Sequence, residues 1–135
     1  MSKASMLPMP REDADELIGR MRDALRAVLA QNGGQREITL LARSVLLTSF
    51  LTEAGFGQLQ PCYLRQTEAM LLGVLDRAES TVDWMVPDSL FERLVAVIDE
   101  HDRQLRCVRF SAVVDATRRL ERLLVATQRT MLADP

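Results

Sequence analysis

Residues 38–54 form the most apolar stretch of the chain, and their hydrophobic side chains fall on nearly every side of a helix. A helix that is apolar all round is typical of the middle of a bundle, because each of its sides must be covered. Arg43 and Glu53 interrupt the stretch, which is also shorter than a typical membrane span. We therefore expect a buried core helix and no membrane association. Gly55 follows at the position where a left-handed residue would end this helix.

Four further segments repeat apolar residues at the spacing of amphipathic helices. Their apolar faces lie within residues 17–29, 63–78, 90–105 and 110–131. Pro61 suits the first turn of the second of these helices. The connection before it is short, which predicts an antiparallel hairpin with the central helix.

The pattern as a whole predicts an all-α, single-domain bundle of about five helices around the central buried helix at residues 38–54. The helical domain is expected to span residues 11–135. Residues 1–10 contain two prolines and no helical period, so we expect a mobile N-terminal arm. The length of 135 residues agrees with one domain, and an aromatic content of only 4% favours helix packing over a sheet sandwich.

Charge is distributed unevenly, although the formal net charge is only -2. Residues 76–102 contain eight acids against two arginines, whereas residues 103–135 contain seven arginines against three acids. Such segments can pair within one subunit or across a symmetric dimer, which needs no ligand. They can also face two unrelated partners.

Arg118, Arg122 and Arg129 recur on one side of the last predicted helix and form a candidate surface for nucleic acid or another acidic partner. An acidic protein with few aromatic residues is poorly suited to nucleic acid, because its long-range field opposes the approach of phosphates. We therefore favour a protein partner, in particular a second copy of the chain, over nucleic acid.

Catalytic, cofactor and metal sites are not evident in the sequence. Cys62 and Cys107 lie in different predicted helices, and we expect reduced, partly buried thiols in a cytoplasmic protein. His101 is the single histidine and lacks metal ligands at helical spacing, so we expect a solvated side chain near a helix end. We expect no enzyme, although one with an unrecognised site stays an alternative.

The sequence FLTEAGFG at residues 50–57, followed by Tyr63-Leu64 and Glu68-Ala69, carries a family resemblance. It resembles a group of short all-helical bacterial proteins with a Phe-Leu-x-x-Ala-Gly-Phe-Gly signature. Some members of that group are labelled as regulators similar to the factor for inversion stimulation. The resemblance implies a helical fold with a capped helix end, and it transfers no functional residue.

These observations together predict a cytoplasmic bacterial interaction or regulatory module that acts as a homodimer. A second possibility is a nucleic-acid-binding regulator that uses the arginines of its C-terminal helix.

Overall fold

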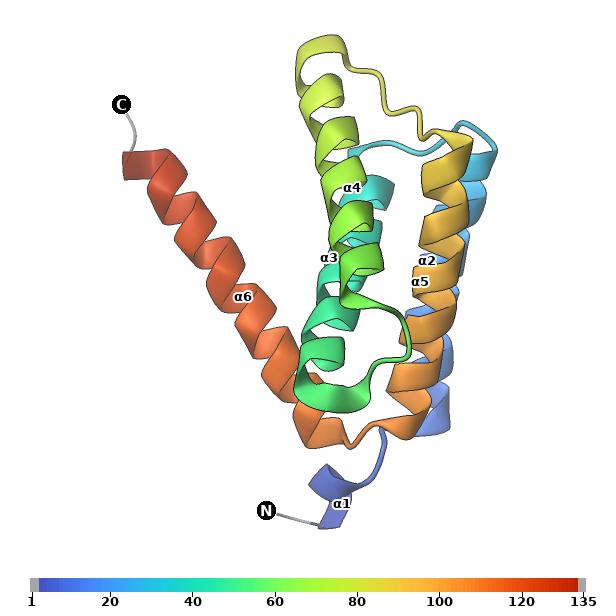
Figure 1. Ribbon diagram of the computed structural model, residues 1–135, viewed down its shortest axis with the longest axis vertical. Coiled ribbons are helices and arrows are strands. Elements are labelled where there is room, and N and C mark those ends of the chain that lie inside the picture. The colour runs from blue at the N-terminus through green and yellow to red at the C-terminus, as the bar shows by residue number, and fades with distance from the viewer. Residues whose placement is uncertain (1–2, 134–135) are drawn as a thin grey trace.

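The computed structural model describes residues 3–133, and within them it contains six α-helices and one π-helical turn. The elements are α1 (Lys3–Met6), α2 (Arg11–Leu29), α3 (Gln35–Leu51), the π-helical turn η1 (Thr52–Phe56), α4 (Pro61–Thr81), α5 (Asp88–Cys107) and α6 (Phe110–Ala133). The five long helices α2 to α6 make up one bundle, which confirms the predicted fold class (Figure 1).

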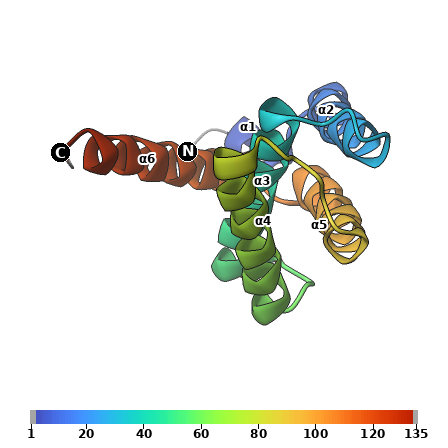
Figure 2. The same cartoon turned by 90° about the horizontal axis from the view of Figure 1, so that it is seen from above.

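Helix α3 lies at the centre of the bundle, as its apolar pattern predicts. It contacts α2, α4, α5 and α6, and seen from above it lies between α6 on one side and the α2–α5 pair on the other (Figure 2). Ile38, Leu41 and Val45 of α3 are completely buried. Each of the other long helices is therefore positioned by its contact with this one helix.

Two polar residues of α3 are also completely buried, and they are satisfied by the helix itself. Ser44 Oγ donates to the carbonyl oxygen of Leu40 at 3.0 Å, and Thr48 Oγ1 donates to that of Ser44 at 2.8 Å. Such hydrogen bonds to the preceding turn let small hydroxyl residues enter a core at little cost. Gln104 of α5 adds a 3.4 Å contact from Nε2 to the carbonyl oxygen of Thr48.

Gly55 has the left-handed backbone that the sequence predicts at the end of the central helix, with a φ of 99°. Gly55 lies inside the η1 turn, which extends the helical segment beyond the end of α3. Phe56 then packs on a hydrophobic cluster at the base of the bundle.

The base of the bundle holds the first turns of α6. Its cluster combines Leu51 of α3, Leu105 of α5 and Val113 of α6 with Met9, which precedes α2 and is only 8% exposed. The backbone N–H of Phe110 donates to the carbonyl oxygen of Leu7 at 2.7 Å. The mobility expected for residues 1–10 stays a prediction, and residues 1–2 lie outside the described part of the chain.

One stretch of the described residues, Gln35–Phe56, is long and apolar enough to cross a membrane by length and composition. Its mean hydropathy is 1.2 over the most apolar window. The central helix of a folded bundle passes the same test, and α3 occupies that position here.

Gly55→Ala should lower the free energy of unfolding by about 1–2 kcal/mol, because a side chain is strained at this positive φ. Gly19→Ala is the matched control, since Gly19 lies on the exposed face of α2 with open space around it. That change should raise the free energy of unfolding by about 0.5–1 kcal/mol. Urea denaturation of both variants measures the two effects. Equal effects of the same sign would contradict a left-handed backbone at Gly55.

Candidate functional site

Helix α6 is anchored at its N-terminal half and uncovered at its C-terminal half. Ala112, Val113, Ala116 and Leu120 are buried, with exposed fractions between 1% and 8%. Every residue from 121 to 129 is exposed. Figures 1 and 2 agree with this change from buried to exposed residues along α6. The helix diverges from the other helices, and its C-terminal half stands away from the bundle.

The apolar face that α6 uses against the bundle continues into the uncovered half. Leu123 and Leu124 follow Leu120 by three and four residues and therefore lie on the same side of the helix. Leu120 is 1% exposed, whereas Leu123 and Leu124 are 45% and 38% exposed. We call Leu120, Leu123, Leu124 and Thr127 the apolar stripe of α6, and only its first residue is covered.

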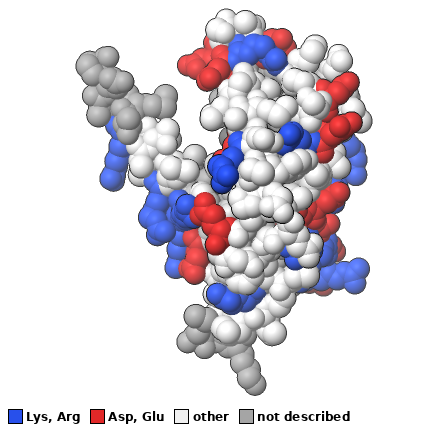
Figure 3. All heavy atoms as spheres, viewed as in Figure 1, with Lys and Arg blue, Asp and Glu red and all other residues white. Residues whose placement is uncertain are grey.

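Arg118, Arg122 and Arg129, which the sequence singles out, all lie exposed on α6. At about 100° per residue they share one face, roughly opposite the apolar stripe. Among the described residues none of the three has an ion-pair partner. Basic side chains follow the α6 arm in the space-filling view (Figure 3). We call these residues the arginine strip.

Arg119 has a different role from its neighbours, and the sequence gives no signal for it. Its guanidinium lies 4.0 Å from the centroid of the Phe50 ring and donates to Glu53 Oε2 at 2.5 Å. Both partners belong to the end of the central helix. Arg119 therefore fastens the middle of α6 to α3 and η1, just before the helix leaves the bundle.

Part of the acidic segment at residues 76–102 pairs within the subunit. Arg22 contacts Asp99 at 2.8 Å and Asp102 at 3.4 Å, and Arg106 contacts Asp102 at 2.5 Å. Four acids of this segment are exposed and have no ion-pair partner among the described residues: Asp76, Glu79, Asp88 and Glu92. The uncompensated acids therefore lie toward the end of α4 and the start of α5.

Glu100 is the most buried acid of the segment, at 6% exposure. It accepts hydrogen bonds from Arg103 Nε at 2.6 Å and from the backbone N–H of Gln58 at 2.5 Å. Burial acts to raise the pKa of Glu100, but these hydrogen bonds outweigh it and hold the pKa below its ordinary value. Arg103 also donates to the carbonyl oxygen of Phe56 at 2.7 Å, so this pair joins α5 to η1.

His101 is buried, contrary to the solvated position expected from the sequence. The side chain is 3% exposed, and its Nδ1 has no hydrogen-bond partner among the described residues. Burial lowers the pKa of His101 to about 4, against the opposing charge of Asp102, so the imidazole is neutral at pH 7. Val97 and Leu105 lie four residues before and after it, and this apolar spacing was the signal for burial.

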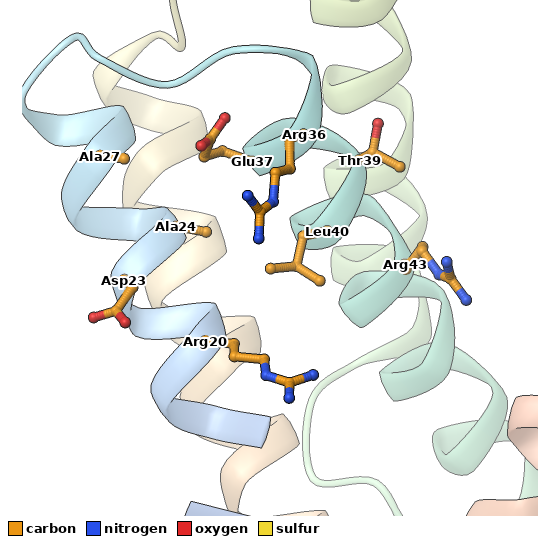
Figure 4. Close-up of a pocket in the computed structure, with 9 residues that line it drawn as sticks. All are labelled: Arg20, Asp23, Ala24, Ala27, Arg36, Glu37, Thr39, Leu40 and Arg43. Carbon is orange, nitrogen blue, oxygen red and sulfur yellow. The ribbon is translucent and has the colours of Figure 1, made fainter. Parts of the chain in front are cut away.

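An open groove of about 550 Å³ lies between α2 and α3 (Figure 4). The guanidinium groups of Arg20 and Arg36 point into the space between the helices, whereas Arg43 points away from it. Arg20 already pairs with Glu16 at 2.6 Å, and Arg36 lies beside the charge of Glu37. The groove is open, and the charges of its arginines are partly neutralised by neighbouring carboxylates, so it defines no specific anion site.

The described residues hold two free thiols and no candidate metal site. No group of three or more His, Cys, Asp or Glu side chains is placed there to hold a metal ion. Cys62 and Cys107 are free and exposed, which corrects the expectation of partly buried thiols. Comparisons with protein-family models, with curated proteins and with solved structures found no match.

Glu100→Ala should lower the free energy of unfolding by about 2–3 kcal/mol, because Arg103 and the Gln58 N–H lose a partly buried anionic partner. Glu92→Ala is the control on the same helix, since Glu92 is exposed and has no ion-pair partner in the described structure. Its effect should stay within about 0.5 kcal/mol. Chemical denaturation of both variants at pH 7 measures the two effects. Equal losses of stability would rule out a structural role for the pair of Glu100 and Arg103.

Burial of His101 should make folding stability depend on pH between its unfolded pKa of 6.5 and its folded pKa of about 4. In this window the unfolded chain binds a proton that the folded protein does not, so acid favours unfolding. The contribution of His101 to the free energy of unfolding should fall by about 3 kcal/mol as the pH drops from 6.5 to about 4. Denaturation curves of the wild type and of His101→Leu measure it, and the variant should lack this part of the slope. Parallel pH profiles for the two proteins would contradict the burial of a neutral imidazole.

Proposed function

We propose that this protein is a homodimeric helical interaction module, in which a second copy covers the exposed half of α6. The apolar stripe supports the proposal most directly. It is buried at Leu120 and exposed at Leu123 and Leu124, on the same face of one continuous helix. A two-fold dimer is the commonest way for a soluble protein to cover such a face.

Two α6 helices can cover each other if they run antiparallel around a two-fold axis near Leu124. Within one subunit α4 and α6 both run away from the base of the bundle and diverge (Figure 1). The α6 arm of a second copy, inserted between them in the opposite direction, turns its apolar stripe toward the stripe of the first copy. Its arginine strip, on the other face, then turns toward α4 of the first copy.

The charges left over within one subunit favour this arrangement. The arginine strip has no ion-pair partner among the described residues, and neither do Asp76 and Glu79 on the exposed face of α4. Leu72 and Gly73 lie on the same face of α4 and are exposed as well, with Leu72 at 59%. Opposite charges around an apolar contact fix the register of two partners, and salt screens the attraction between them.

A nucleic-acid-binding regulator is the second candidate, because the arginine strip is solvent-exposed and lacks ion pairs. Three phosphate contacts would make the logarithm of the binding constant fall with that of the salt concentration, at a slope of about -3. A monomeric protein that binds duplex DNA with this slope would favour the second candidate. DNA binding that Arg118→Glu leaves unchanged would argue against a role of the strip in it.

The mass in solution should be twice 15.2 kDa at low ionic strength and should fall toward the monomer value as salt is added. Salt weakens the proposed contact because the screening length drops from about 10 Å at 0.1 M to about 3 Å at 1 M. Light scattering across a salt series measures this. A monomer at every salt and protein concentration would refute the dimer.

Leu124→Arg should raise the dimer dissociation constant at least about tenfold, because it places two charges in the apolar contact. Val125→Arg is the comparison variant, since it adds the same charge one residue later, on the side of the arginine strip and away from the apolar stripe. Its effect should stay below about threefold. Sedimentation equilibrium of the two variants separates the faces, and a larger effect at Val125 would place the contact elsewhere on α6.

A further inference from the structure

A second feature lies at the base of α6, and of the arginine strip only Arg118 borders it. A cavity of about 480 Å³ opens where α6 leaves the bundle, between α6 and the helices α2, α3 and α5. Its walls are mainly apolar and include Leu17, Met21, Leu47, Leu105, Val113 and Val114. The cavity is about half open to solvent, and its volume is in the range of clefts that bind small organic ligands.

The cavity has one buried polar group in its wall, the imidazole of His101. Its Nδ1 is fully covered and has no hydrogen-bond partner among the described residues, which leaves Nε2 as the ring nitrogen that a ligand can reach. A neutral imidazole has one donor and one acceptor nitrogen, so burial without partners is unfavourable. A ligand hydroxyl at Nε2 would supply a partner for one of the two nitrogens.

The remaining polar groups show which ligands do not fit. Arg118 and Glu121 both line the cavity and are exposed, and their charges oppose each other three residues apart on α6. The cavity therefore offers no net charge for an ionic ligand, and apolar walls disfavour one further. Met9 and Met21 also line it, and their unbranched side chains can adjust to the shape of a guest.

We propose that this cavity binds a small uncharged apolar molecule that carries a hydroxyl group, which forms a hydrogen bond with His101. A hydroxyl both donates and accepts, so it can pair with Nε2 in either neutral tautomer of the imidazole. The apolar body of the ligand replaces water against the aliphatic walls.

Phenol and toluene test the proposal, because they have similar size and differ in the hydroxyl group. His101 is the single histidine, so its ring nitrogens give unambiguous NMR signals in ¹⁵N-labelled protein. Phenol should shift these signals saturably and bind about five- to tenfold more tightly than toluene. Equal affinity for the two probes, or a His101 signal that phenol leaves unmoved, would overturn the proposal.

His101→Leu should remove the preference for phenol while toluene still binds. Val114→Phe should weaken both probes about tenfold by filling the cavity, whereas Val125→Phe, on a similar face of α6 but outside the cavity, should leave them unchanged. Equal weakening by the two phenylalanine variants would overturn the location of the site. The comparison of probes in the wild-type protein needs no variant, so a poorly folded variant leaves the test decisive.

Discussion

The structure depends on the packing of four helices against α3. Helices α2, α4, α5 and α6 all contact it, and its buried face from Ile38 to Leu51 has almost no exposed area. At 1.5 Å per residue, the 17 residues of α3 span about 26 Å, whereas the 24 residues of α6 span about 36 Å. Since α6 also diverges from α3, its C-terminal half has nothing to pack on within one subunit.

The direction of α6 is fixed by polar contacts at the base of the bundle. Arg103 joins Glu100 of α5 to the carbonyl oxygen of Phe56, and Arg119 joins α6 to Glu53 and the Phe50 ring. These contacts hold the end of the central helix, the η1 turn and the first half of α6 together. The uncovered half of α6 is therefore an extension of a well-anchored helix, which suits a role in association.

Sequence periodicity was sufficient to predict the five long helices α2 to α6, because each one buries a face of regular spacing, but it did not predict the short helix α1. It also placed Gly55, since few residues other than glycine adopt a positive φ at a helix end. It could not predict the contact of Arg119 with Glu53 or that of Glu100 with the Gln58 N–H, whose residues lie 66 and 42 positions apart in the chain. Contacts of this kind depend on how the helices are packed together. His101 was misjudged because its charged neighbours in sequence point to other sides of α5.

Hydrogen exchange of the α6 amides at several protein concentrations tests most directly whether a second copy covers this helix. Uncovered helical turns open easily and exchange fast, whereas packed turns are protected. We expect the amides of residues 121–133 to become protected as the protein concentration rises, while the exchange of the α2 amides stays constant. Fast exchange of residues 121–133 at every concentration would contradict it.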